Sequence, residues 1–129
     1  GFPQAEVAQA QPTLTARPAG ASFATITTSD LAQMLQTEEF TLVNVHVPYE
    51  GHIEGTDAFV PFDEITDDLS KLPADKRANI VVYCMSGRMS EIAAHALSQA
   101  GYSNVSHVAG GMVDWRAGGR GILNSPVQR

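Results

Sequence analysis

Cys84 is the residue of this sequence whose type and setting most favour covalent chemistry. It is the only cysteine in the chain, so an internal disulfide and a zinc site built from several cysteines are both excluded. It directly follows an apolar run at residues 80–83, and a short loop separates it from the next apolar pattern. Two interpretations are open, a nucleophile or an inert core thiol, because free cysteines are among the most buried residue types.

The loop after Cys84 has the features of an anion-binding cradle. Its residues are Met85, Ser86, Gly87, Arg88, Met89 and Ser90. Gly87 can adopt backbone angles that other residues avoid, so successive N–H groups can face inward toward the sulfur. The N-terminus of the helix expected beyond the loop adds a partial positive charge. A thiolate, a persulfide or a bound oxyanion would be stabilised there, which favours Cys84 as a nucleophile.

The residue at position 90 argues against one chemistry that uses such a cradle. Cysteine phosphatases close their loop with an Arg six residues after the nucleophile, because a bidentate guanidinium must hold the phosphoryl group. In this chain that position is Ser90. The cation of the loop is Arg88, which we expect at the rim, where it would meet an incoming anion. Phosphoryl transfer and arsenate reduction are therefore disfavoured.

The elements that must position this loop follow from the hydrophobic pattern. Residues 80–83 are apolar throughout, as in a strand covered on both faces of a parallel sheet, so we expect this strand to be central. Apolar residues recur at helical spacing from Met89 to Ala100, and Gly101 stands where this helix should end. Further strands are expected at residues 23–26, 41–45, 58–60 and 105–108, with short helices over 64–69 and around Trp115. Alternating strands and helices predict an α/β domain built on a parallel sheet.

The first helix has a start signal of its own. Thr27 can cap its N-terminus with Asp30 as the reciprocal partner, and Ile26 and Leu31 flank the cap as a hydrophobic staple. Leu31 and Met34 then begin an apolar face. We therefore expect a helix directly after the first strand.

The ends of the chain differ in composition from its middle. Residues 1–22 are rich in Ala, Gln, Pro and Thr and lack an apolar period, so we interpret them as a flexible linker. Residues 23–121 are expected to form the domain, and residues 122–129 a C-terminal tail. No basic stretch precedes an apolar run, so no signal peptide is expected within the chain. A linker left after signal cleavage would have this composition, which favours an exported or periplasmic location over a cytoplasmic one.

Composition and charge exclude several classes of function. Hydrophobic residues make up 43% and charged residues 17% of the chain, which is ordinary for a globular domain. The net charge of −6 and the scattered basic residues argue against a nucleic-acid partner. No apolar run reaches the ~20 residues that a membrane-spanning helix needs.

The four histidines do not predict a metal site. They are His46, His52, His95 and His107. No pair of them has a metal-binding spacing such as His-Glu-x-x-His, so we expect neither a metal nor another cofactor. His52 is expected to tie a turn to the sheet and His95 to lie exposed. His46 is the one expected near Cys84, although a purely structural role is favoured for it.

Several motifs, taken in order, resemble those of a single-domain rhodanese. They are Asn44-Val45-His46, Gly51-His52-Ile53-x-Gly55, Cys84-x-x-Gly87-x-x-Ser90 and Gly110-Gly111-x-x-x-Trp115. The resemblance covers residues 23–121 and implies a rhodanese-like α/β fold, with a five-stranded parallel sheet flanked by helices on both faces. It also implies transfer of sulfane sulfur through a persulfide on Cys84, from thiosulfate or another persulfide to cyanide or a thiol.

The sequence departs from the family pattern at residues near the loop. The resemblance marks Asn44, His46 and His52 as candidate supports behind the loop. Asn44 and His46 stand where members usually have Asp and Arg, so an ion pair behind the loop is expected to be absent. Met89 occupies a place that is often Arg, which leaves Arg88 as the main positive charge of the loop.

The sequence therefore leaves two functions of different kinds open. The favoured one is a sulfurtransferase, and the alternative is a sulfide-carrying or regulatory binding module with slow turnover. The expected partners are a small-molecule sulfur donor and acceptor, or a thiol-bearing partner protein. We expect a monomer that binds no nucleic acid and does not itself span a membrane.

Overall fold

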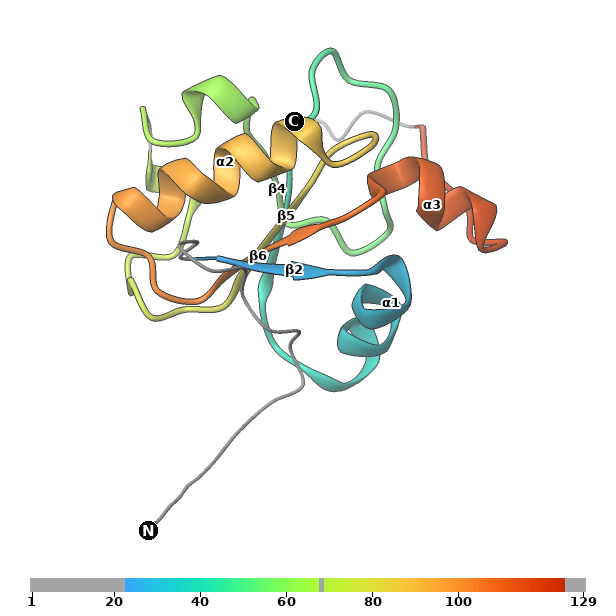
Figure 1. The fold of residues 1–129 in the computed structure, drawn as a ribbon, viewed down its shortest axis with the longest axis horizontal. Coiled ribbons are helices and arrows are strands. Elements are labelled where there is room, and N and C mark those ends of the chain that lie inside the picture. The colour runs from blue at the N-terminus through green and yellow to red at the C-terminus, as the bar shows by residue number, and fades with distance from the viewer. Residues whose placement is uncertain (1–22, 68, 125–129) are drawn as a thin grey trace, which may run out of the picture.

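The computed structural model describes residues 23–67 and 69–124, and the predicted linker at residues 1–22 lies outside them (Figure 1). The elements in chain order are β2 (Ala24–Ile26), α1 (Thr28–Thr37), β3 (Thr41–Asn44), β4 (Ala58–Phe59), η2 (Phe62–Glu64), η3 (Leu69–Lys71), β5 (Ile80–Tyr83), α2 (Arg88–Gln99), β6 (Val105–Val108) and α3 (Gly111–Ala117), where η denotes a 3-10 helix.

The five strands form one parallel sheet in the order β2-β6-β5-β3-β4. This confirms the predicted α/β architecture and the central place of β5, which pairs with β3 on one side and β6 on the other. All four residues of β5 are buried, because helices cover both faces of the sheet. The strand therefore delivers the residue after it, Cys84, to the middle of one sheet edge.

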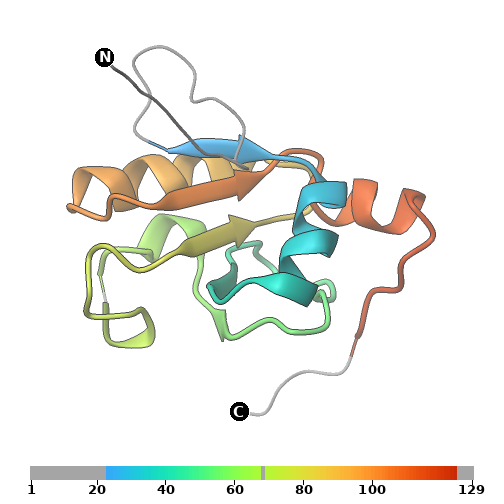
Figure 2. The same cartoon turned by 90° about the horizontal axis from the view of Figure 1, so that it is seen from below.

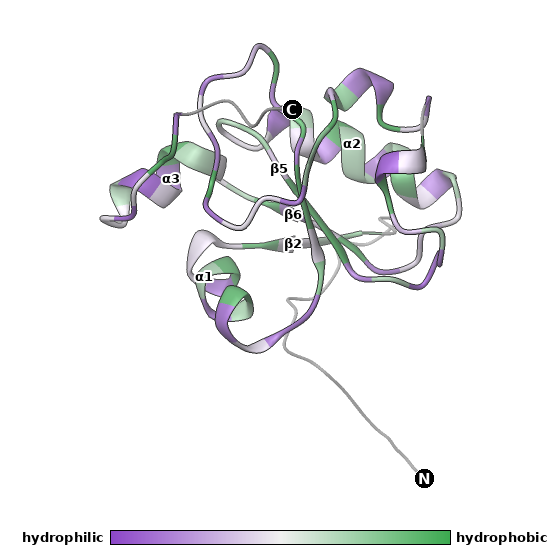
Figure 3. Ribbon diagram, turned by 180° about the vertical axis from the view of Figure 1, so that it is seen from behind, coloured by the Kyte–Doolittle hydropathy of each residue, from purple (hydrophilic) through white to green (hydrophobic). Residues whose placement is uncertain are grey.

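Two hydrophobic clusters cover the two faces of the sheet. Side chains alternate along β5, so Val82 and Cys84 join the cluster that contains the buried face of α2, whereas Val81 and Tyr83 join the cluster that contains α1 and α3. In Figure 1, α2 and α1 lie on opposite sides of β2 and β6. Figure 2 shows α1 and α3 beside each other at one end of the strands, and Figure 3 shows hydrophobic colouring gathered on the central strands.

The start of α1 confirms the predicted cap. The Asp30 amide donates to the Thr27 hydroxyl oxygen at 3.1 Å, and the Thr27 amide donates to an Asp30 carboxylate oxygen at 3.0 Å. This capping box satisfies two N–H groups at the start of the helix that would otherwise lack partners. Leu31 and Met34 then lie buried against the sheet.

The helix predicted over residues 64–69 is wrong. The segment instead holds two 3-10 helices, Phe62–Glu64 and Leu69–Lys71, and Asp67 donates its amide to the Glu64 carbonyl three residues back at 3.0 Å. Ile65 is the buried apolar residue of this stretch and its acidic neighbours are exposed. One anchor without an apolar face favours tight turns over an α-helix, whose stability in proteins comes mostly from packing.

The other departure lies on α2, where Ile92 was expected in the buried face. Its side chain is 47% exposed, whereas Ala93, Ala94 and Leu97 are fully buried. The buried stripe is therefore narrower than the sequence pattern and is made largely of small residues. Alanines allow α2 to pack closely on the sheet, which brings its first turn near Cys84.

The N-terminus of α3 is attached to the backbone of the Cys84 loop. Met112 donates its amide to the Cys84 carbonyl at 3.0 Å, and Val113 donates to the Met85 carbonyl at 2.9 Å. Gly111 makes this approach possible, because a side-chain Cβ there would overlap the Cys84 carbonyl oxygen and lie 2.7 Å from the Met85 carbonyl carbon. Its φ of +51° also lies in the left-handed region.

We predict that Gly111→Ala lowers the free energy of unfolding by about 2–4 kcal/mol, because the new methyl group would push the Cys84 loop away from α3. Gly119→Ala is the matched control. Gly119 also has a positive φ, +87°, but a Cβ there would meet nothing within 4 Å, so its cost should be about 1 kcal/mol. Urea denaturation of both variants measures the difference. Equal losses would contradict the close approach at Gly111.

Tyr83 generates a second prediction, on stability at alkaline pH. Its hydroxyl oxygen accepts the Ile53 amide at 3.0 Å and lies 2.7 Å from the Thr56 hydroxyl. Burial raises the Tyr83 pKa from 10.0 to about 12, against the opposing effect of its hydrogen bonds. Because the unfolded chain then loses its proton first, folded stability should fall as pH rises from about 10 to about 12.

Tyr83→Phe should remove this part of the alkaline decline. It should also lower stability at neutral pH by about 1–3 kcal/mol, because the buried Ile53 amide loses its acceptor. Tyr102→Phe is the control, and it should keep the alkaline decline of the wild type. Denaturant unfolding across the alkaline range measures all three proteins. An undiminished decline in Tyr83→Phe would show that another group is responsible.

Candidate active site

Cys84 lies at the carboxyl end of β5, where its sulfur accepts two backbone hydrogen bonds. The Gly87 amide lies 3.0 Å from Sγ and the Ser90 amide 3.4 Å from it. The residue is 2% exposed, so both hydrogen bonds form in a buried setting. Such donors favour negative charge on the sulfur, and they are strongest when the acceptor is ionised.

The sulfur also replaces the side-chain cap of α2. Gly87, the residue before the helix, adopts a φ of +118° and has no side chain to cap it. The Ser90 amide belongs to the first turn of α2, whose N–H groups have no partners within the helix. Sγ accepts this amide as the oxygen of a Ser or Asp cap does in other helices.

Ser90 and His107 form a buried hydrogen-bonded pair next to the thiol. The Ser90 hydroxyl lies 3.1 Å from the Gly87 carbonyl and 3.0 Å from Nδ1 of His107. Ser90 is fully buried and His107 is 6% exposed. Burial lowers the pKa of His107 below its usual 6.5, and the charge of Glu91 opposes this shift.

The contact between His107 and Ser90 was not predicted from the sequence, where His107 was considered only as a possible metal ligand. The signal that could have found it is the parallel register, in which His107 pairs with Val82 on the central strand. Side chains at paired positions share a face, so His107 lies on the same face as Cys84, two residues beyond Val82. That register emerges only once β5 and β6 are placed side by side.

The other loop residues are less buried than Cys84, Gly87 and Ser90. Ser86 and Arg88 are exposed, as expected for a cation placed to meet an anion. Met85 and Met89 are half-buried and pack against opposite clusters, Met85 with α1 and α3 and Met89 with α2. Met89 therefore belongs to the packed face of its helix, as its spacing predicted.

The structure places Asn44 at the end of β3, and His46 and His52 in the segment that follows this strand. Asn44 donates to the Gly51 carbonyl at 3.0 Å and accepts the His46 amide at 2.9 Å. The His52 ring contacts the Tyr49 hydroxyl through Nδ1 at 2.7 Å. Most of these hydrogen bonds lie within the segment, and Asn44 also bonds the Tyr83 side chain of β5. The bonds that the structure gives for these three side chains do not involve the side chains of the Cys84 loop.

His52 also links this segment to the C-terminal end of the domain. Its backbone exchanges two hydrogen bonds with Leu123, each 2.8 Å long. Its ring packs edge-on against Phe59 with 5.2 Å between the ring centroids. Residue 123 was assigned to the tail, and here it is paired to the segment before β4.

The acidic partner of His46 is Glu50 rather than the residue at position 44. His46 Nε2 lies 2.6 Å from a Glu50 carboxylate oxygen, so His46 does contact an acidic partner, four residues along the chain. Asn44 is uncharged, and its side chain bonds the backbone of Gly51 and His46 instead. The contact joins residues of one short segment, which the family comparison of single positions could not indicate.

The described residues hold no group of three or more His, Cys, Asp or Glu side chains that could bind a metal ion. In the same part of the chain, no helix is both long enough and apolar enough to cross a membrane.

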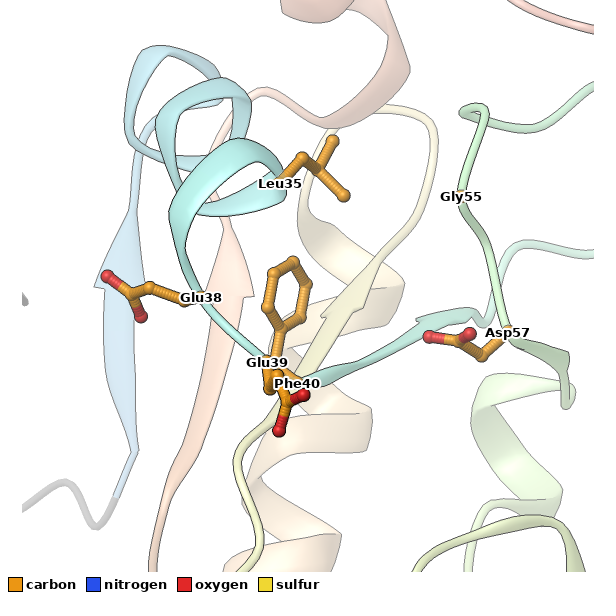
Figure 4. A pocket seen from close by; sticks show the side chains of 6 residues that line it. All are labelled: Leu35, Glu38, Glu39, Phe40, Gly55 and Asp57. Carbon is orange, nitrogen blue, oxygen red and sulfur yellow. The ribbon is translucent and has the colours of Figure 1, made fainter.

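A cavity of about 380 Å³ lies at the opposite edge of the sheet from Cys84. Figure 4 shows its lining residues, Leu35, Glu38, Glu39, Phe40, Gly55 and Asp57. Residues 38–40 directly precede β3 and Asp57 precedes β4, so the cavity is at the amino ends of these strands. Its three carboxylates would repel an anionic sulfur donor, which separates it from the chemistry of the thiol.

Comparison with known proteins identifies the family of this domain. Residues 27–118 match the family model described as a rhodanese-like domain. A sulfurtransferase from Allochromatium vinosum is 35% identical over 103 residues, which are 76% of this chain and 92% of that protein. The probable adenylyltransferase/sulfurtransferase MoeZ of Mycobacterium tuberculosis is 36% identical over 97 residues, 70% of this chain and only 24% of MoeZ.

Solved structures agree with the sequence matches. A rhodanese-related protein from Thermoplasma volcanium aligns with a TM-score of 0.66 and 26% identity, over 78% of this chain and 98% of that one. A rhodanese-like domain protein from Staphylococcus aureus gives the same TM-score and identity over 79% of this chain and 98% of that one. The chain therefore belongs to the rhodanese-like domain family and is homologous to sulfurtransferases.

Proposed function

We propose that the chain transfers sulfane sulfur by way of a persulfide on Cys84. The observation that supports this most directly is the pair of backbone N–H groups, from Gly87 and Ser90, that point at Sγ. A thiolate is the nucleophilic form of cysteine, and a persulfide is likewise anionic, so donors that face the sulfur stabilise both. Homology to sulfurtransferases supports the same chemistry.

The proposed reaction has two steps that together restore the thiol. The Cys84 thiolate attacks the outer sulfur of thiosulfate, so a new S–S bond forms to Cys84 while the S–S bond of thiosulfate breaks and sulfite leaves with the electron pair. Cyanide or a thiolate then attacks the terminal sulfur of the persulfide. The Cys84–sulfur bond breaks, the acceptor leaves as thiocyanate or a persulfide, and the thiolate is regenerated.

Arg88 is proposed to attract the donor. Its side chain is exposed at the first position of α2, close in sequence to both amides that face the sulfur. Thiosulfate is a dianion and the chain carries a net charge of −6, so a local cation should raise the rate of productive encounter. Arg88 is expected to act before the covalent step rather than within it.

A second candidate is a sulfur-carrying module that turns over slowly and passes its persulfide to a thiol-bearing partner protein. The burial of Cys84, at 2% exposed, favours the slow turnover of this candidate, because any donor or acceptor must reach a buried sulfur. The two candidates differ in rate. One round of persulfide formation without steady-state production of thiocyanate would favour the module.

We predict that thiosulfate makes the protein heavier by one sulfur atom and that cyanide removes the added mass. Cys84 is the only cysteine, so intact mass spectrometry assigns the adduct without digestion. Cys84→Ser is the matched control and should stay unmodified. An unmodified wild type, or the same adduct on Cys84→Ser, would rule out the persulfide.

Arg88→Ala should lower kcat/KM for thiosulfate by about tenfold at low ionic strength and leave the melting temperature unchanged, because an exposed arginine acts mainly through its field. Added salt should shrink the difference between variant and wild type. Arg77→Ala is the charge-matched control. Arg77 is exposed in the turn before β5, at the far edge of the sheet, and its loss should have little effect. Equal effects of the two variants would show that Arg88 has no local role.

A further inference from the structure

We propose that His107 is a positioning residue that acts through Ser90 to hold the amide donors of Gly87 and Ser90 against the sulfur of Cys84. The proposal rests on the function proposed above, since it concerns how the same thiol is held. Its evidence is a continuous chain of contacts, from Nδ1 of His107 to the Ser90 hydroxyl at 3.0 Å and from there to the Gly87 carbonyl at 3.1 Å. The two residues that this chain fixes are the two whose amides reach Sγ.

The place of His107 in the fold makes it a rigid support. It lies within β6, whose four residues are all buried, and β6 is paired on both sides, with β2 and β5. Phe23 packs against the ring at 78° with 5.6 Å between centroids, which restricts its rotation. The loop is therefore attached to the sheet at two points, by its covalent connection to β5 and by the contact between Ser90 and His107.

A count of protons determines which atoms donate. The Ser90 hydroxyl carries one proton, and the Gly87 carbonyl can only accept. For the contact of 3.1 Å to be a hydrogen bond, Ser90 must donate to Gly87, and then Nδ1 of His107 must donate to the Ser90 oxygen. The reverse arrangement would leave two oxygens facing each other without a proton between them.

The same count predicts the state of the imidazole. His107 must carry a proton on Nδ1, and burial favours the neutral ring, which places it in the Nδ1–H tautomer. The Gly87 carbonyl also accepts the Glu91 amide at 3.0 Å, so it receives one bond from the backbone of α2 and one from the Ser90 side chain. Loss of the His107 donor would leave the Ser90 hydroxyl held by its bond to Gly87 without a link to the sheet, and it would loosen the turn that presents both amides.

Nuclear magnetic resonance of the histidine ring nitrogens tests this assignment without any sulfur donor. We expect the neutral Nδ1–H tautomer for His107 in the wild-type chain at neutral pH. A neutral Nε2–H ring would overturn the proposal, because Ser90 would then have to donate to His107 and could not also hold Gly87.

Substitutions at position 107 test the consequence for the loop. His107→Leu removes the donor, whereas His107→Asn places an amide group near the position of Nδ1. In His107→Leu we expect the amide-proton shifts of Gly87 and Ser90 to move and persulfide formation from thiosulfate to slow by about tenfold, the effect of one lost hydrogen bond. His107→Asn should restore both towards the wild type. His95→Leu, which changes an exposed histidine of α2, is the matched control and should alter neither.

The outcomes separate this inference from the proposed function. A His107→Leu variant that keeps the wild-type amide shifts, or a His107→Asn variant no better than His107→Leu, would overturn the positioning role. If His107→Leu fails to fold, the tautomer of the wild type still decides the matter. A wild type that takes up no sulfur, but shows the expected tautomer and amide shifts, would refute the proposed function and leave the positioning role intact.

Discussion

The structure of this domain depends on the turn of backbone from Cys84 to Ser90, which must close around a single sulfur atom. Sγ accepts amides from Gly87 and Ser90, and it thereby caps the helix that follows. The turn requires a left-handed φ at residue 87, and glycine adopts it without the strain that a residue with a side chain would have. The sulfur therefore has a structural role beside the reactive one proposed for it, because it accepts the Ser90 amide in the first turn of α2 and the Gly87 amide just before the helix.

Three elements outside the turn hold it in this shape. The parallel sheet places β5 between β3 and β6, so the loop emerges at the centre of an edge rather than at its margin. The start of α3 binds the carbonyls of Cys84 and Met85, which orients the first half of the loop. His107 on β6 contacts Ser90, which orients the second half. Each support comes from a different element, so the geometry of the loop is a property of the whole domain.

Most of the fold could be predicted from sequence because its signals are local. The capping pair Thr27 and Asp30 and the apolar run of β5 act over a few residues, and both are present as predicted. The helix predicted over residues 64–69 was wrong because Ile65 gives one apolar anchor but no apolar face. The contact between His107 and Ser90 spans 17 positions and depends on strand register, and the partner of His46 depends on the path of a loop. The first contact joins residues far apart in the sequence. The second joins residues four positions apart, but this segment is not helical, so the spacing alone does not predict the contact.

The surroundings of Ser90 also support the proposal that this loop handles sulfur rather than a phosphoryl group. The residue is fully buried, and its amide and hydroxyl are both engaged, with Cys84, Gly87 and His107. An Arg at this position would have to place a guanidinium among these groups, where burial of a charge without a carboxylate partner costs several kcal/mol. A phosphoryl dianion needs such a guanidinium, whereas the charge of a persulfide can be held by backbone amides alone. The packing around position 90 therefore favours an anion attached covalently to Cys84, such as the proposed persulfide, and the proposal assigns attraction of a free anion to the exposed Arg88.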